Sequence, residues 1–149
     1  FSSVILRCGL YSDFILQHWL HETAISLPLA DARITPVSRD DVAAAAVHAV
    51  LGPAVGTAQL TGAVSYSMAE IAAVATRAFG KRYSYQPCAP EAYFERLTAG
   101  VDDPWPEAFS TLCASIREGR YAATSPHFPQ EDFESFLRRS AQGQSLSRV

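Results

Sequence analysis

The residues best placed to do chemistry follow the first apolar run of the chain. Gly9 and Tyr11 come directly after Val4–Arg7, and Phe14 and Trp19 come next. The apolar run predicts a strand buried on both faces, of the kind found inside a parallel sheet. Open α/β sheets place ligands just beyond the carboxyl ends of such strands. Gly9 and Tyr11 are therefore predicted to border a ligand crevice, whereas helix-to-sheet packing explains Phe14 and Trp19 at least as well.

Other residues with chemical potential have simpler interpretations. Cys8 could be a reactive thiol, but buried free cysteine is usually a small apolar packing residue. His18 and His21 are three residues apart on one predicted helix, yet no third ligand follows at a matching interval, so no metal site is predicted. The pairs Asp40-Asp41 and Asp102-Asp103 could act as acid and base, but they fit a helix start and a solvated loop better. No catalytic residue is identified.

Known cofactor and nucleophile motifs are absent from the sequence. It contains no G-x-G-x-x-G, no G-x-x-x-x-G-K-[ST], no G-x-S-x-G and no H-E-x-x-H. The three cysteines, Cys8, Cys88 and Cys113, are widely spaced and are expected to be reduced thiols. The sequence therefore predicts neither a self-contained nucleotide-binding domain nor a disulfide framework.

Composition limits the class of protein. The chain has 149 residues, of which 48% are apolar and 18% charged, and its net charge is -3. These values are typical of a single globular domain and disfavour nucleic acid as a partner. No apolar run approaches the roughly 20 residues that span a bilayer, and the first residues lack the charged n-region and apolar h-region of a signal peptide. A cytoplasmic location with no membrane association is the default expectation.

Helical and strand patterns alternate along the first half of the chain. Helical spacing predicts a helix over Tyr11–His21, whose first turn Ser12 and Asp13 could cap. A loop is predicted over Ala24–Asp31 and a strand over Arg33–Val37. Ser38 is then expected to cap an alanine-rich helix that ends at Gly52-Pro53.

The second half continues this alternation. A strand over Thr57–Gly62 precedes the capping box Ser67–Glu70, which opens a helix that ends at Gly80. The pattern then predicts one further strand and three helices, followed by a polar tail: Arg82–Gln86, Glu91–Ala99, Glu107–Glu118, Glu131–Arg139 and Gln142–Val149. A proline-rich turn is expected at Ser125–Pro129. Strands separated by helices indicate an α/β protein with parallel pairing.

Several of these segments, in this order, resemble the C-terminal half of NmrA-like proteins, a branch of the atypical short-chain dehydrogenase/reductase superfamily that includes NAD(P)H-dependent quinone reductases. The matching segments are Val4–Tyr11 with Phe14, Arg33–Ala43, Gln59–Gly62, Ser67–Ala72, Gly80-Lys81, Tyr83–Gln86, Pro90–Tyr93 and Pro126–Leu137. Two departures stand out. Cys8 occupies the position where the family usually has proline, and the family's glycine-rich dinucleotide loop precedes the strand with which this chain begins.

The resemblance implies the C-terminal part of a Rossmann-like doubly wound sheet plus a small substrate-binding lobe. Residues 1–141 would form this half and residues 142–149 a polar tail, with the N-terminal dinucleotide-binding half absent from the chain. Val4–Arg7 and Ala58–Thr61 would be the last two strands of the sheet. Arg33–Val37 and Tyr83–Gln86 would belong to the lobe.

The function that the resemblance implies is part of an NAD(P)H-dependent oxidoreductase acting on a small quinone- or carbonyl-type substrate. Backbone N–H groups of Cys8, Gly9, Leu10 and Tyr11 would border the nicotinamide, and Tyr11, Phe14 and Tyr93 would line the substrate. NADP or NAD would bind only together with the N-terminal half, so the chain alone is expected to be inactive.

Two other functions remain open at this stage. The chain could be part of a non-catalytic, dinucleotide-sensing regulator, since NmrA relatives include such proteins, or a truncated remnant held together by self-association. The strand Val4–Leu6 would be left with an unpaired edge, which favours pairing with an N-terminal segment or a second copy.

Overall fold

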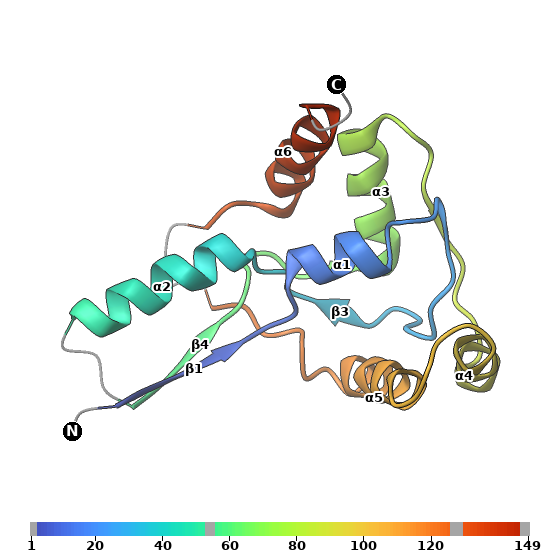
Figure 1. The fold of residues 1–149 in the computed structure, drawn as a ribbon, viewed down its shortest axis with the longest axis horizontal. Coiled ribbons are helices and arrows are strands. Elements are labelled where there is room, and N and C mark those ends of the chain that lie inside the picture. Colours follow the sequence, from blue (N-terminus) through green and yellow to red (C-terminus); the bar gives the residue numbers. More distant parts are fainter. Residues whose placement is uncertain (1–2, 53–55, 126–129, 147–149) are drawn as a thin grey trace.

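The computed structural model describes residues 3–52, 56–125 and 130–146. Within these ranges, short strands alternate with helices along the chain (Figure 1). The strands are β1 (Val4–Cys8), β2 (Ala24–Ile25), β3 (Arg33–Ile34), β4 (Gly56–Leu60), β5 (Tyr66–Ser67) and β6 (Ser84–Tyr85). The helices are α1 (Ser12–His18), α2 (Arg39–Leu51), α3 (Met68–Phe79), α4 (Pro90–Thr98), α5 (Trp105–Arg117) and α6 (Phe133–Leu146).

The longest strand pair is β1 with β4, and it is parallel. Its register runs from Val4 opposite Gly56 to Cys8 opposite Leu60. The predicted parallel pairing of these two segments is therefore confirmed. Because both carboxyl ends lie at the same edge, the loops after Cys8 and after Leu60 begin side by side, while α2 runs along one side of the pair (Figure 1).

The prediction that this first strand is buried on both faces is wrong. Exposure alternates along β1, and Ile5 is 58% exposed. Only β4 pairs with β1 among the described residues, and α2 is the helix in closest contact with β1. One face of β1 therefore remains open.

Two further strand pairs hold the rest of the molecule together. Strand β2 pairs with β6 in parallel, and β3 pairs with β5 antiparallel. The prediction of a loop throughout Ala24–Asp31 is therefore wrong, and so is the expectation of parallel pairing only. Each of these strands has two residues, which is too short to produce a periodic sequence pattern.

Capping explains where two helices begin. The Ser38 hydroxyl accepts a hydrogen bond from the Asp41 N–H at the start of α2. At α3, the Ser67 hydroxyl accepts from the Glu70 N–H while the Glu70 carboxylate accepts from the Ser67 N–H, so the predicted capping box is confirmed. These hydrogen bonds satisfy N–H groups that a helix leaves without an internal partner.

Helix α1 begins differently from its prediction. Its N-cap residue is Tyr11, whose side chain makes no capping hydrogen bond, so the proposed caps Ser12 and Asp13 are wrong. The Ser12 N–H instead donates to the Val37 carbonyl, which binds the start of the helix to the segment after β3. The helix ends at His18, earlier than predicted.

The last two helices also differ from their predicted limits. Helix α5 begins at Trp105, two residues before the predicted start at Glu107, and ends at Arg117. Helix α6 begins at Phe133 and continues through residues 142–146, which were expected to be a frayed tail. Residues 126–129 of the predicted proline turn lie outside the described residues.

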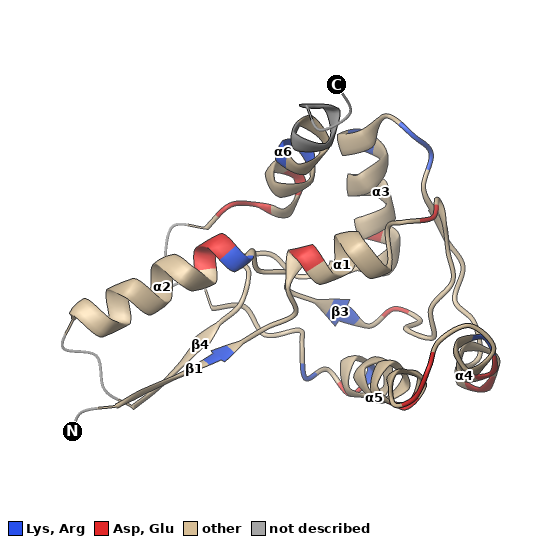
Figure 2. Cartoon of the chain, in the orientation of Figure 1, with Lys and Arg blue, Asp and Glu red and all other residues tan. Residues whose placement is uncertain are grey.

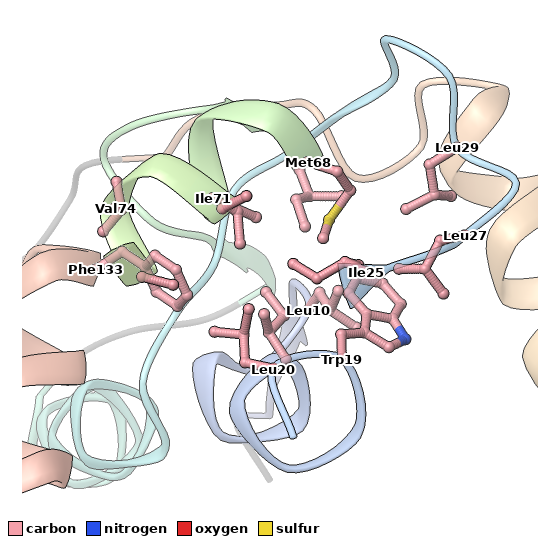
Figure 3. Close-up of a cluster of buried hydrophobic side chains, with 14 of the residues drawn as sticks. Leu10, Trp19, Leu20, Ile25, Leu27, Leu29, Met68, Ile71, Val74 and Phe133 are labelled. Atoms are coloured by element: carbon pink, nitrogen blue, oxygen red, sulfur yellow. The ribbon is translucent and has the colours of Figure 1, made fainter. Parts of the chain in front are cut away.

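The hydrophobic core lies where α1, α3, α6 and the segment around β2 meet (Figure 3). Ile15, Ile71 and Leu137 are fully buried there, and Trp19 is 5% exposed. Helices α3 and α6 pack along one another, and Glu134 of α6 accepts hydrogen bonds from Arg77 of α3. Trp19 thus packs in the core, which is one of the two roles that its sequence position left open.

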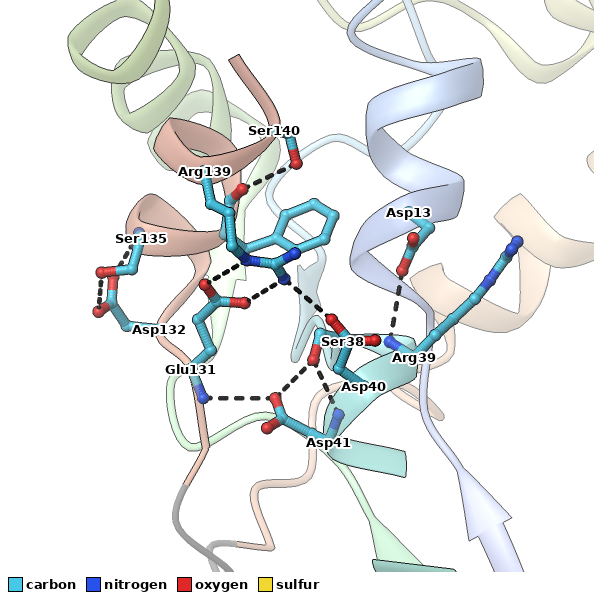
Figure 4. Close-up of polar contacts among 11 residues, drawn as sticks. Asp13, Ser38, Arg39, Asp40, Asp41, Glu131, Asp132, Ser135, Arg139 and Ser140 are labelled. Atoms are coloured by element: carbon cyan, nitrogen blue, oxygen red, sulfur yellow. Dashed lines mark hydrogen bonds and ion pairs between the residues drawn. The ribbon is translucent and has the colours of Figure 1, made fainter. Parts of the chain in front are cut away.

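Polar contacts attach α6 to the N-terminal end of α2 (Figure 4). Arg139 pairs with Glu131 at 2.7 Å and with Asp40 at 3.2 Å. The Asp41 carboxylate accepts hydrogen bonds from the Ser38 hydroxyl and from the Glu131 N–H. Asp40 and Asp41 thus serve the helix start, as predicted from their sequence position. No helix in the described ranges is both long and apolar enough to span a bilayer.

Candidate functional site

The loop after β1 is fixed by backbone hydrogen bonds on both sides. The Gly9 N–H donates to the Leu60 carbonyl at 2.7 Å, and the Leu10 carbonyl accepts from the Val37 N–H at 3.0 Å. The loop therefore lies between the carboxyl end of β4 and the segment after β3. This is the edge at which an α/β sheet presents its ligand site.

Two backbone donors of this loop remain available. The Gly9 N–H is used within the fold, so it is not free to bind the nicotinamide carboxamide as the sequence suggested. In the described part of the chain, the N–H groups of Leu10 and Tyr11 have no hydrogen-bond partner. The loop therefore contains two adjacent backbone donors that the described fold leaves unpaired.

The side chains of Tyr11 and Cys8 lie together. A hydrogen bond with the Cys8 thiol, followed by burial, raises the pKa of the Tyr11 hydroxyl. The guanidinium carbon of Arg39 lies 5.9 Å from the centre of the Tyr11 ring. Tyr11 thus packs between β1 and the start of α2.

A small polar cavity of about 290 Å³ opens at the carboxyl ends of β1 and β4. Its wall includes Arg7, Cys8, Gly9, Gln59, Thr61 and Arg120. Arg120 also forms an ion pair with Glu118 at 2.8 Å. The predicted position of a crevice beyond the first strand therefore coincides with a cavity bordered by Cys8 and Gly9.

A larger cavity of about 470 Å³ lies between α1, β2, α4 and α5. Buried Trp19, Ile25 and Leu27 contribute its apolar wall, and Tyr93 and Phe109 face it from α4 and α5. We call this space the aromatic cavity. Of the predicted substrate residues, Tyr93 lines it, whereas Tyr11 lies elsewhere, beside Cys8.

Five aromatic rings form a continuous cluster at the edge of the aromatic cavity, those of Phe14, His18, Trp19, Trp105 and Phe109. Phe14 lies 4.6 Å from His18 and 6.0 Å from Phe109, measured between ring centres. Trp105 stacks on Phe109 at 5.9 Å and is 55% exposed. The structure thus brings the predicted Phe14 to the cavity through its contacts with His18 and Phe109, both of which line it.

The sequence did not identify Phe109 and Trp105 as site residues. They are four residues apart, so they share one face of α5, and this spacing was the available signal. From the sequence, His18 was expected to be a solvent-facing or packing residue rather than a metal ligand. No group of three potential metal ligands occurs among the described residues.

Arg96 provides a cation at the rim of the aromatic cavity. One of its guanidinium nitrogens donates to the Ser26 carbonyl at 2.6 Å. The guanidinium carbon also lies 5.4 Å from the centre of the Tyr93 ring. A carbonyl contact and a cation–π contact therefore hold the charged group at the cavity.

Behind the cavity, Tyr93 and Cys113 form a buried pair. Burial is the main cause that raises the pKa of the Tyr93 hydroxyl and of the Cys113 thiol. The pKa of the Cys113 thiol is raised to about 11. Both groups therefore remain neutral at physiological pH. A neutral buried thiol is a poor nucleophile, so Cys113 is a packing residue.

Comparison with known proteins gives matches only among solved structures. No protein-family model matches the sequence, and no curated protein matches it. The NADP(H) complex of triphenylmethane reductase from Citrobacter sp. superposes with a TM-score of 0.81 at 22% identity, covering 94% of this chain and 53% of that one. The NADPH complex of a quinone oxidoreductase from Escherichia coli gives 0.81 at 19% identity, covering 95% and 53%.

A regulatory protein shares the fold as well. The negative transcriptional regulator NmrA, in complex with NAD, gives a TM-score of 0.66 at 16% identity, covering 99% of this chain and 55% of that one. This chain spans about half the length of each of these three proteins. The structure is thus an α/β arrangement matching about half of a Rossmann-like, NmrA-type fold, which confirms the fold class expected from the sequence resemblance.

Proposed function

We propose that this chain, whose fold is half of an NmrA-like dinucleotide-binding protein, is the substrate-side part of an NAD(P)H-dependent oxidoreductase that reduces a planar quinone- or carbonyl-type compound. The observation that carries the proposal is the aromatic cluster at the mouth of the aromatic cavity. Flat aromatic molecules stack on such surfaces. The fold shared with two NADP(H)-bound reductases supports the cofactor assignment.

The residues of the loop fit a nicotinamide. The free N–H groups of Leu10 and Tyr11 match a carboxamide oxygen, and they lie at the carboxyl ends of β1 and β4. A reduced nicotinamide cofactor supplies a hydride when bound. Helix α1 begins at this loop and carries Phe14 and His18, so one rigid element connects the donors to the substrate surface.

The substrate side acts by orientation and by exclusion of water. Phe109 and His18 would hold the substrate ring in a fixed plane, and the buried side chains of Trp19 and Ile25 would keep that part of the cavity dry. Orientation and a dry pocket are the main contributions of a protein to cofactor-based reduction. No side chain is assigned as an acid or a base.

Binding of a flat quinone to the 149-residue chain tests this proposal directly. Hydroxymethyl anthraquinone is a suitable probe because it has no position at which cysteine adds readily. We expect saturable binding by isothermal titration calorimetry, weakened about tenfold in Phe109→Ala because about 1.4 kcal/mol of ring contact is lost. Phe94→Ala, at an exposed ring of α4 that does not line the cavity, should bind like the unmodified chain. Absence of binding, or equal loss in both variants, would contradict the proposal.

A second candidate function is supported by the likeness to NmrA. A non-catalytic dinucleotide sensor would share the loop and the fold but would not turn over a substrate. An assay of NADPH consumption and binding, on a protein that also contains the dinucleotide-binding half, would distinguish the reductase from the sensor. Consumption of NADPH in the presence of a quinone supports the reductase, whereas NADPH binding without consumption supports the sensor.

The apolar surface of α2 and the unpaired edge of β1 are the observations that favour a further polypeptide partner. Figure 2 shows that the charged residues of α2 are confined to its N-terminal end. The remainder exposes Val47, Val50 and Leu51, of which Leu51 is 82% exposed. We propose that additional polypeptide covers this apolar surface and the free edge of β1, either an N-terminal segment or a second copy.

This proposal predicts self-association of the 149-residue chain. Apolar burial and strand-edge pairing should produce a concentration-dependent dimer in sedimentation velocity. Leu51→Glu should raise the dissociation constant at least about tenfold, because a carboxylate would be desolvated at the interface. Phe94→Glu places the same charge on an exposed apolar position of α4 and should change little. A monomer at high concentration would contradict the prediction.

A further inference from the structure

Arg96 is one of the five described arginines that form no ion pair with a carboxylate, the others being Arg7, Arg39, Arg82 and Arg117. Arg33, Arg77, Arg120, Arg138 and Arg139 each form an ion pair with a carboxylate. Within the described residues, no carboxylate lies within ion-pair distance of Arg96, whose guanidinium instead donates to the Ser26 carbonyl. Its charge is therefore uncompensated by a direct partner.

The positive charge of Arg96 lies beside the aromatic cavity. The guanidinium lies at the rim of the aromatic cavity, over the Tyr93 ring, and Ser26 also lines the cavity. Since a guanidinium has five N–H donors in a planar fork, the bond to Ser26 leaves donors for a second acceptor. A carboxylate or sulfonate group can accept two parallel hydrogen bonds from a guanidinium at once.

The other polar groups of the cavity are Gln17, His18, His21 and Glu22. Glu22 is the one carboxylate among the described lining residues, and it would repel an anionic ligand. Both side chains are exposed, but the Arg96 guanidinium is held by its bond to the Ser26 carbonyl and by its contact with the Tyr93 ring. The fixed charge is therefore positive, and the negative charge is on a side chain free to move away.

We propose that the aromatic cavity selects planar aromatic substrates that carry an acidic group, with Arg96 binding the carboxylate or sulfonate and the aromatic cluster stacking on the ring. This inference rests on the proposed function and specifies its substrate class. Arg96 is then a specificity residue at the wall of the aromatic cavity. Neutral quinones of the same shape would bind through the ring contacts alone.

The test compares two probes that differ in charge, anthraquinone sulfonate and hydroxymethyl anthraquinone, by isothermal titration calorimetry with the 149-residue chain. We expect the sulfonate to bind about tenfold more tightly at low salt, and we expect this preference to disappear in Arg96→Gln, while affinity for the neutral probe changes less than twofold. Arg82→Gln removes the same charge from an arginine that does not line the cavity, so it controls for net charge and should retain the preference.

A second variant tests the proposal without altering Arg96. Glu22→Gln removes the repelling carboxylate and should strengthen sulfonate binding about threefold without affecting the neutral probe. If the neutral probe binds and the sulfonate is not preferred, or if Glu22→Gln leaves sulfonate affinity unchanged, the inference is overturned and the proposed function stands. If neither probe binds, the proposed function fails as well.

Discussion

Replacing Gly62 with alanine is expected to destabilise the chain by about 3 kcal/mol, at the upper end of the usual cost of overpacking. A Cβ atom built at Gly62 overlaps the Pro36 carbonyl oxygen and lies 3.1 Å from the Pro36 carbonyl carbon. Both atoms belong to backbone, so no flexible side chain can move aside. The close approach arises because the turn after β4 packs on the segment that follows β3.

Urea denaturation followed by circular dichroism measures this effect. Gly100→Ala is the matched control, because its added Cβ would lie 3.9 Å from the Arg96 carbonyl oxygen, an ordinary contact. We expect the unfolding free energy of the control to change by less than about 1 kcal/mol. Equal stability of the two variants would show that the turn after β4 does not pack as described.

Replacing Ile71 with alanine is expected to cost about 2–5 kcal/mol of unfolding free energy. The Ile71 side chain is fully buried where α3 meets the core (Figure 3). Its removal loses the transfer free energy of the side chain and leaves a cavity that the packed neighbours Met68 and Val74, on the same helix, cannot fill. For a domain with a total stability of about 5–15 kcal/mol, this is a large fraction.

Val47→Ala is the corresponding surface variant. Val47 is 58% exposed on α2 of a single chain, and alanine is the better helix former. At a concentration low enough to keep the chain monomeric, the unfolding free energy should therefore change by less than about 0.5 kcal/mol. The same urea denaturation measures both variants. A loss in Ile71→Ala no larger than that in Val47→Ala would contradict the position of Ile71 in the core.

Local interactions account for the parts of the fold that could be predicted from sequence. Ser38 and Ser67 cap α2 and α3 with groups three residues away, and Gly80 ends α3 in a left-handed conformation. Such signals depend on neighbouring residues only. The parallel pairing of β1 with β4 was expected from the family resemblance, which made these segments the last two strands of one sheet, although two helices and two short strands lie between them in the chain.

The wrong predictions of short strands and of burial have a common cause, which is contact between residues distant in sequence. Ala24–Ile25 forms a strand only because Ser84–Tyr85 lies beside it, and Tyr66–Ser67 does so opposite Arg33–Ile34. Pairs this short carry no periodic pattern. Likewise, Ile5 was expected to be buried from its type alone, but its exposure depends on which elements cover that face.

The candidate site divides in the same way. The sequence by itself determined that the loop Cys8–Tyr11 follows a strand and precedes a helix, which placed it at a ligand edge of the sheet. Only the tertiary structure decided that the Gly9 N–H donates to the Leu60 carbonyl and that the Tyr11 side chain contacts Cys8. It also decided that the rings of Phe109 and Phe14 lie in contact beside a cavity. The physical reason is that strands and caps arise from contacts close in sequence, whereas a cavity arises from helices that are distant in sequence and meet only in the folded chain.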